Sequence, residues 1–372
     1  MPQEILTKIF DYVVSSQGTL PSIVRLGKVC KLWHSVSCMP ELWKNVDLAQ
    51  YTTEKCKTDY KLVWLLENRL SKCQSLNIGK SQWKVCNITW VLACVVDYCP
   101  ALVELSVAGW SRMTPEQLYE LVQGLPKLQR LDLSLTSYFF SPAGATGERS
   151  CHCIFTNTLR STWRHLAEFL FSLAPIALTY VTLQAHCTNL EVLDISGAQA
   201  TSHPAAVPLE ALQKGCPKMR VFRAANSQLV LGSMEVPGWT QLEELSIAGS
   251  ATAERVAVGE YRLGDDALER LVRGATRLTL LDLRGLSRLT DSGLVRVPAW
   301  DLQHLFLGGC NVTRQSNACL ELICEKWSHS LLELDLSWAS AARVLDDAVR
   351  ALADATESKL RSVHSLSEEC LF

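Results

Sequence analysis

The sequence predicts an α/β fold in which a small helical unit at the N-terminus precedes a curved solenoid of strand, turn and helix repeats. Two observations carry this prediction. Through about the first fifty residues, apolar residues recur every three or four positions, which is the spacing of one helix face. From about residue 70 onward, a phrase of three apolar residues at positions i, i+3 and i+5 recurs along the chain, and such repetition is typical of solenoids.

The N-terminal unit is expected to contain two short helices and a third helical turn. The first helix carries one apolar stripe, which consists of Ile5, Leu6, Ile9, Phe10 and Val13. It ends before Pro21. The second helix carries a stripe of Ile23, Leu26, Val29/Cys30, Trp33 and Val36 and ends at Met39-Pro40. The helical turn follows at Glu41-Leu42-Trp43. A unit of this size buries only a small fraction of its surface. Some of its apolar side chains are therefore expected to meet a partner or the following domain.

Three segments of this unit resemble the F-box family: Pro2-x-Glu4-Ile5-Leu6-x-x-Ile9-Phe10, Val29-Cys30-x-x-Trp33 and Pro40-x-Leu42-Trp43. The resemblance implies that residues 1–48 form a three-helix F-box, which docks on the Skp adaptor of a cullin-based ubiquitin ligase. The docking residues that it implies are Pro2, Ile5, Leu6, Ile9, Phe10, Val29, Cys30, Trp33, Leu42 and Trp43. Some of these ten must also form the internal core of the unit. One departure is Met1, which stands where the family usually has Leu before the Pro. A repeat scaffold with a non-functional F-box therefore remains the alternative.

Residues 49–72 are expected to form a linker helix, and leucine-rich repeats are expected over residues 73–136 and 186–372. Most copies of the phrase lie about 23 to 29 residues apart, which is the period of leucine-rich repeats, and they begin at Leu102, Leu128, Leu190, Met219, Leu242, Leu278, Leu302 and Leu331. Between them lie stretches with helical spacing. Stacked units of this kind place a parallel sheet on the concave side and helices outside.

Residues 137–185 interrupt the repeats and are expected to be an irregular insertion or a degenerate repeat. Within them, the stretch from Leu166 to Leu183 is nearly uncharged and long enough for a membrane helix. Because a span there would split one solenoid across a membrane, no membrane is expected. The cluster Cys151-His152-Cys153 has the residue types of a metal site but no second pair of ligands, so no metal is expected.

The rest of the chain indicates neither catalysis nor nucleic-acid binding. No phosphate-binding loop, dinucleotide fingerprint or nucleophile motif is present, so no catalytic residue and no cofactor are expected. A net charge of −2 provides no basic field for nucleic acid. The N-terminus does not have the pattern of a secretory signal. The odd number of 15 cysteines then favours reduced thiols in a cytoplasmic and/or nuclear protein.

Three of these cysteines, Cys99, Cys187 and Cys216, precede the leading apolar residue of a phrase by three positions. They are predicted to be small buried residues of the stack. The arrangement resembles the cysteine-containing repeat subtype that accompanies F-boxes.

Taken with the F-box segments, these repeats resemble the F-box and leucine-rich-repeat class of substrate receptors. The resemblance implies a non-catalytic substrate-recognition subunit of an SCF-type (Skp-cullin-F-box) E3 ubiquitin ligase. Its partners would be the Skp adaptor, through it the cullin and RING subunits, and an unknown protein substrate. Candidate substrate-binding residues lie on the concave side of the repeats: Asp132, Asp194, Asp282, Phe306 and Asp335. The aspartates are either an acidic row that selects a basic peptide or ordinary solvated residues of the repeat.

Overall fold

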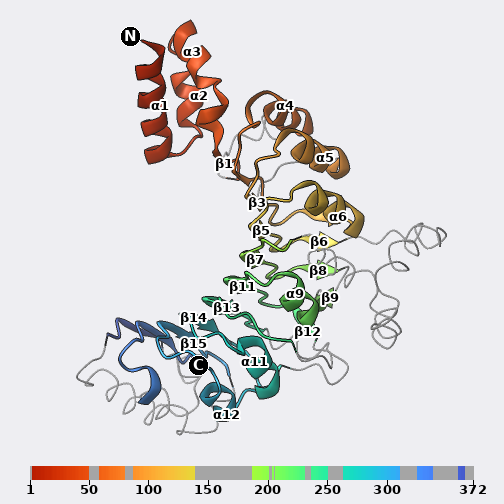
Figure 1. Cartoon of the computed structure of the whole chain (residues 1–372), viewed down its shortest axis with the longest axis vertical. Coiled ribbons are helices and arrows are strands. Elements are labelled where there is room, and N and C mark those ends of the chain that lie inside the picture. Colours follow the sequence, from red (N-terminus) through yellow and green to blue (C-terminus); the bar gives the residue numbers. More distant parts are fainter. Residues whose placement is uncertain are drawn as a thin grey trace, which may run out of the picture.

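The structure is a computed structural model that describes residues 2–49, 58–79, 87–138, 187–200, 203–204, 206–230, 236–249, 263–310, 325–337 and 359–364. It is a curved solenoid that carries a small helical unit at its N-terminal end (Figure 1). The strands follow the inner side of the curve and the helices lie outside it, so the predicted α/β solenoid is confirmed.

The N-terminal unit consists of α1 (Gln3–Gln17), α2 (Ser22–Leu26), α3 (Lys31–Ser37) and the 3₁₀ turn η1 (Pro40–Trp43). Helix α1 ends at Gly18, whose φ of 83° favours glycine. The prediction of one continuous second helix was wrong, because the chain breaks between α2 and α3. Gly27 lies at this break, where a Cβ atom would stand 2.5 Å from Ser37 Oγ. The missing side chain lets α3 turn back closely against α2.

The main sheet has eleven parallel strands whose spatial order is their order in the chain. Each strand is short, and its central residue, where described, is buried in the solenoid. The strands are β1 (Asn45–Asp47), β2 (Ser75–Asn77), β3 (Glu104–Ser106), β5 (Arg130–Asp132), β7 (Val192–Asp194), β11 (Val221–Arg223), β13 (Glu244–Ser246), β14 (Leu280–Asp282), β15 (His304–Phe306), β16 (Glu333–Asp335) and β17 (Ser362–His364).

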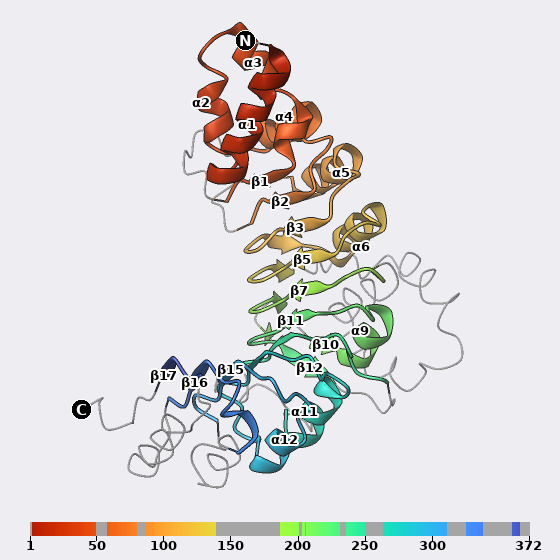
Figure 2. The ribbon, with the colours of Figure 1, turned by 60° about the vertical axis from the view of Figure 1, so that its left-hand side comes forward.

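The helices lie on the outer side of the solenoid (Figure 2), and two small sheets lie on the same side (Figure 1). The described helices are α4 (Asp59–Arg69), α5 (Ile88–Tyr98), α6 (Pro115–Gly124), α9 (Leu209–Gly215), α11 (Asp265–Val272) and α12 (Asp291–Val295). One small sheet joins β4 (Ser111–Met113), β6 (Ser137–Tyr138), β8 (Gln199–Ala200) and β9 (His203–Pro204), and the other joins β10 (Ala206–Pro208) and β12 (Gln228–Val230). Thr114 starts α6 with a capping box, in which it exchanges hydrogen bonds with Gln117.

The sheet begins earlier in the chain than the repeat boundaries expected from the sequence. Strand β1 pairs in register with β2, although β1 lies within the segment expected to close the N-terminal unit. Helix α4, expected as a linker, connects these two strands and packs beside α5. It therefore occupies the place of an outer helix of the first repeat.

The long gap between two copies of the phrase does not interrupt the sheet. Strand β5 pairs directly with β7, Leu131 opposite Leu193. Beyond the strands, Leu133 N donates to Asp194 O and Leu135 N donates to Ser196 O. No further strand of this sheet can therefore lie between β5 and β7. Apart from residues 137–138 in β6, the segment 137–185 falls outside the described residues.

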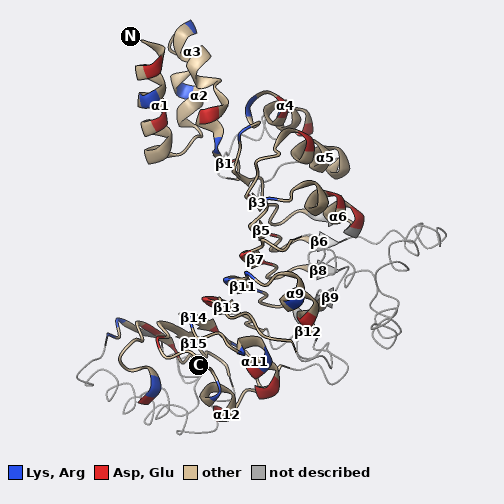
Figure 3. Cartoon of the chain, viewed as in Figure 1, with Lys and Arg blue, Asp and Glu red and all other residues tan. Residues whose placement is uncertain are grey.

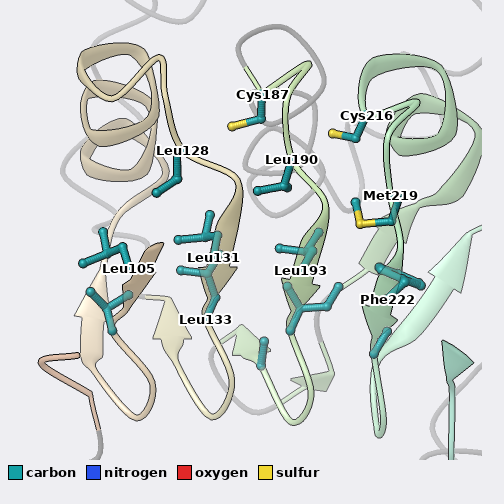
Figure 4. Packing of buried hydrophobic residues seen from close by; sticks show 14 of the residues in the cluster. Leu105, Leu128, Leu131, Leu133, Cys187, Leu190, Leu193, Cys216, Met219 and Phe222 are labelled. Atoms are coloured by element: carbon teal, nitrogen blue, oxygen red, sulfur yellow. The ribbon is translucent and has the colours of Figure 1, made fainter. Parts of the chain in front are cut away.

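The core is a stack of apolar rows, one residue of each repeat per row (Figure 4). Leu131, Leu193 and Phe222 occupy neighbouring places in one such row. The predicted burial of Cys99, Cys187 and Cys216 is confirmed, and burial raises the pKa of each of these thiols to about 12. In other repeats Leu125 and Trp239 stand at the equivalent position. The cysteines thus serve as core residues of modest size.

The nearly uncharged stretch from Leu166 to Leu183 and the possible metal ligands Cys151-His152-Cys153 fall outside the described residues. Within the part of the chain that the structure describes, no helix has the length and apolar character that a membrane crossing requires. The same part contains no group of three His, Cys, Asp or Glu side chains that could bind a metal ion.

Candidate functional site

Helix α1 has two apolar faces, and only one of them is covered. Leu6 and Phe10 are fully buried, one turn apart. Ile5 and Ile9 precede each of them by one residue and are 50% and 41% exposed. Since residues one position apart on a helix point in directions about 100° apart, packing of the first pair leaves the second pair at the surface.

The buried residues form a compact core of the N-terminal unit. Phe10 meets the half-buried ring of Trp33 edge to face, with ring centroids 5.2 Å apart. Trp43 is buried and its Nε1 donates a hydrogen bond of 2.9 Å to Ser37 O. Leu42 is also buried. These side chains hold the unit together, and of them only Trp33 is partly exposed.

The exposed large hydrophobic residues of this unit are the aliphatic Ile5, Ile9, Val29 and Leu32 and the aromatic Tyr12. Val29 is 61% exposed and precedes α3, while Leu32 lies in its first turn. Leu32 was not among the predicted docking residues. Because the next residue, Trp33, packs inward against Phe10, the side chain of Leu32 points outward.

The ten predicted docking residues therefore fall into three groups. Five are exposed: Pro2, Ile5, Ile9, Val29 and Cys30. Trp33 is half-buried, and four belong to the core: Leu6, Phe10, Leu42 and Trp43. Of these ten residues, only the exposed group and the partly exposed Trp33 are available for contact with another protein.

The N-terminal unit is joined to the first repeat by several contacts. Lys44 O accepts hydrogen bonds from Gln74 N and Ser75 N. Lys72 Nζ pairs with the carboxylate of Glu41, and this hydrogen bond lowers the pKa of Glu41. The unit is thus attached to the end of the solenoid directly, without an intervening free linker.

The predicted aspartates of the concave side have a structural role. Asp132, Asp194, Asp282 and Asp335 each end a strand, and Oδ1 of each accepts the backbone N–H two residues later. Asn77 makes the same contact at the end of β2. This local bond shapes the turn that follows the strand. The side chains are therefore ordered by the repeat itself. Oδ2 of Asp132 and Oδ2 of Asp282 accept further hydrogen bonds, from Ser106 Oγ at 2.8 Å and from Ser246 Oγ at 3.0 Å.

Around Phe306 the concave surface carries a group of interacting charged and aromatic side chains. Arg284 Nε and Nη2 donate to the two carboxylate oxygens of Asp282, both at 2.9 Å. The Arg284 guanidinium lies 5.2 Å from the centroid of the Phe306 ring. The His304 ring stacks with the Phe306 ring, with ring centroids 6.5 Å apart, and His304 Nδ1 lies 3.1 Å from Glu333 Oε2. Two of the predicted substrate residues, Asp282 and Phe306, thus lie in one cluster with Arg284.

The predicted substrate residues are not brought into one pocket. They follow the register of the sheet, with Asp132 beside Asp194 and Asp282 beside Phe306, which in turn lies beside Asp335. Two strands, β11 and β13, separate the first pair from the other three. The arrangement is an extended face across the sheet, which suits a protein segment better than a small molecule.

Comparison with known proteins finds an F-box at the N-terminus. Residues 1–49 match the model of the F-box-like family. The chain is 22% identical over 245 residues to the F-box protein MAX2 of Arabidopsis thaliana, a match that covers 60% of this chain and 34% of that relative. The chain thus spans about a third of the length of this curated relative.

Solved structures give weaker similarity. The yeast Rad7 and Elc1 complex matches at 15% identity and a TM-score of 0.49, covering 97% of this chain and 75% of that one. The mouse RP105/MD-1 complex matches at 14% identity and a TM-score of 0.40, covering 80% and 43%. These scores add no evidence on function. From the family match and the fold together, residues 1–49 form an F-box-like unit at the head of a leucine-rich-repeat solenoid.

Proposed function

We propose that the protein is the substrate-recognition subunit of an SCF-type E3 ubiquitin ligase. The N-terminal unit docks on a Skp-type adaptor and through it reaches the cullin and RING subunits, while the solenoid holds a protein substrate. The protein itself catalyses nothing. It raises the effective concentration of a substrate lysine near the charged ubiquitin-conjugating enzyme.

One observation supports this proposal most directly. A unit that matches the F-box-like family keeps four aliphatic side chains at its surface, Ile5, Ile9, Val29 and Leu32, although it has a formed core. Exposed aliphatic residues gathered on a small unit favour a protein interface. Residues 208–223 and 325–337 also resemble F-box and leucine-rich-repeat protein 6, which is the individual receptor that we propose as most similar.

The proposed setting is the cytoplasm and/or the nucleus, where the ligase subunits would meet the chain. The eight described cysteines carry free thiols, as a reducing compartment favours.

The test is co-elution of a purified Skp-type adaptor with the full chain and with Ile5→Asp/Ile9→Asp. Both substituted side chains are exposed, so the variant keeps the buried pair Leu6 and Phe10. The matched control is Val295→Asp, because Val295 is 53% exposed but lies at the end of α12. We expect the wild type and the control to bind and the double variant to lose binding. A folded wild-type chain that binds no adaptor would refute the proposal and leave a repeat scaffold.

A further inference from the structure

We infer that the part of the N-terminal unit around α3 receives an acidic surface of the Skp-type adaptor, and that Lys28 and Lys31 set the rate at which this surface associates. The inference rests on the proposed function, because it concerns the partner of the same site. It adds the charge of the partner's surface and divides the work between two kinds of side chain. The exposed aliphatic residues hold the bound adaptor, whereas the lysines attract it.

The charges of the N-terminal unit are unevenly distributed along the chain. Helix α1 carries both signs, whereas residues 12–40 contain no Asp or Glu and three cationic side chains, Arg25, Lys28 and Lys31. Lys and Arg are seen on α2 and α3 in Figure 3. Because the whole chain has a net charge of −2 and residues 12–40 contribute +3, the rest of the chain carries −5. The surface around α2 and α3 is therefore a cationic region of an otherwise acidic chain.

The cations lie beside exposed aliphatic residues. Lys28 directly precedes Val29, and Lys31 directly precedes Leu32 in the first turn of α3; all four residues are exposed. The turn before α3 is held by backbone hydrogen bonds, one of which runs from Lys28 N to Arg25 O at 3.2 Å. An apolar centre with charged residues at its edge is the usual composition of a protein interface. The segment therefore has both parts of such an interface in a fixed arrangement.

These cations are available to a partner. Arg25, Lys28 and Lys31 are exposed, and the side chain of none of them forms an ion pair or a hydrogen bond with another residue that the structure describes. By contrast, Lys72 at the junction with the first repeat is already paired with Glu41. A carboxylate of the partner can therefore pair with the cations around α3 without breaking an existing contact, and charge complementarity favours an acidic partner.

The two lysines attract a partner jointly. Lys28 and Lys31 are separated by three residue steps, which span at most about 11 Å. This is close to the Debye length of about 10 Å at 0.1 M salt, so the attractions of both lysines add at the same point outside the surface. The rest of the chain repels an acidic partner weakly, so the partner is oriented toward α3 as it approaches. Charges at the edge of an interface act mainly on the association rate and on its salt dependence.

The test measures association and dissociation rates of a purified Skp-type adaptor with the full chain by biolayer interferometry, at roughly 0.05 M and 0.5 M salt. The test variant is Lys28→Gln/Lys31→Gln. The matched control is Lys127→Gln/Lys214→Gln, which replaces two exposed lysines of the solenoid. Both variants change the net charge of the chain from −2 to −4, so an effect of net charge alone is the same in both. A third variant, Lys28→Arg/Lys31→Arg, keeps the charges and changes the side chains.

We expect the test variant to associate roughly three- to tenfold more slowly than the wild type at the lower salt concentration. At the higher concentration the two rates should converge, because salt screens the lysines. The dissociation rate should change by less than about twofold. The control and the arginine variant should associate at the wild-type rate.

Equal slowing of the test variant and the control would show attraction to net charge alone and would overturn the inference. An unchanged or faster association of the test variant would show that the adaptor surface facing α3 is not acidic. Slowing that persists at the higher salt concentration would indicate a steric effect and would overturn the inference as well. In each of these cases the wild type still binds, so the proposed function stands. A folded wild-type chain that binds no adaptor would overturn both.

Discussion

Phe10 of α1 and Trp33 of α3 meet edge to face, with their ring planes at 72°. Such a pair adds about 0.5–1.5 kcal/mol to what burial alone contributes. It also fixes how α1 is rotated against α3. Ile5 and Ile9 remain at the surface because Leu6 and Phe10 occupy the inner face of the same helix. The proposed docking residues thus depend on a core that they do not belong to.

Replacing Phe10 should therefore open the N-terminal unit, whereas replacing Ile9 should not. Phe10→Ala is expected to lower the local free energy of unfolding by about 3–5 kcal/mol, as loss of a buried aromatic ring does. Ile9→Ala, at a 41% exposed position, is expected to cost less than about 1 kcal/mol. Amide hydrogen exchange across α1 measures both. Unchanged protection in Phe10→Ala would contradict the core described above.

The pairing of β5 with β7 predicts that residues 139–186 can be replaced without loss of the solenoid. The neighbouring repeat supplies a substitute, because Met113 pairs in register with Tyr138 and Leu125 occupies the position of Cys187. A second copy of residues 114–124, which includes α6, should therefore bridge Tyr138 and Cys187.

The grafted chain is expected to keep its far-ultraviolet circular dichroism per repeat and a single main thermal transition close to that of the original chain. A matched deletion that joins Tyr138 directly to Cys187 should fail, because the equivalent residues Met113 and Leu125 are connected by residues 114–124 and are not adjacent in the chain. If the graft and the deletion were equally unstable, the continuity of the sheet across this point would be in doubt.

Buried thiols predict a loss of stability in alkali. Burial raises the pKa of Cys99, Cys187, Cys216 and Cys310 from the ordinary 9.0 to about 12. In the unfolded chain these thiols ionise near pH 9, whereas in the folded chain they stay neutral. Their contribution to stability is therefore complete below pH 9 and is lost as the pH rises from about 9 toward 12.

Thermal unfolding of the wild type and of Cys187→Ala/Cys216→Ala between pH 8 and 11 measures this effect. Lysines and tyrosines titrate in the same range, so the difference between the two proteins isolates the two thiols. The unfolding temperature of the wild type should fall more steeply with pH than that of the variant. Parallel curves would mean that the thiols ionise freely in the folded protein.

Much of the solenoid could be predicted because the repeated phrase places its apolar residues on the same side of every strand. The phrase around Leu131, for example, gives both the strand and its buried residue. Strand β1 was not predicted, because Trp43 takes the leading place of the phrase, ahead of Val46 and Leu48. A search restricted to aliphatic residues misses this copy, although the buried position accepts a large ring.

The candidate sites were less predictable, because they depend on which of several apolar or acidic residues is covered. Ile5/Ile9 and Leu6/Phe10 have the same helical spacing, and only packing against α3 decides which pair is exposed. The concave aspartates lie at the ends of their strands as expected, but Asp282 and Asp335 are buried there, only 6% and 7% exposed. Their hydrogen bonds to the following turn and the partnership of Asp282 with Arg284 come from three-dimensional contacts that no pattern of residue types contains.

The turns after the strands allow a last prediction, which contrasts two equivalent positions. Gly285 and Leu135 both donate their N–H to the turn of the next repeat, and both have positive φ, 77° and 56°. A Cβ atom on Gly285 would lie 1.9 Å from Gly249 O. Gly285→Ala should therefore displace backbone and cost more than about 1–2 kcal/mol. Leu135 already accepts the left-handed conformation and is 60% exposed.

For Leu135→Gly, relief of the left-handed strain offsets the greater freedom of glycine in the unfolded chain, so its stability should stay within about 1 kcal/mol of the wild type. Thermal unfolding of the two variants, with Leu135→Ala as the control that keeps a Cβ atom, tests the contrast. The close approach of the backbone at Gly285 requires that its variant be the least stable of the three. If Gly285→Ala unfolds at the wild-type temperature, neighbouring turns must be able to move apart at little cost.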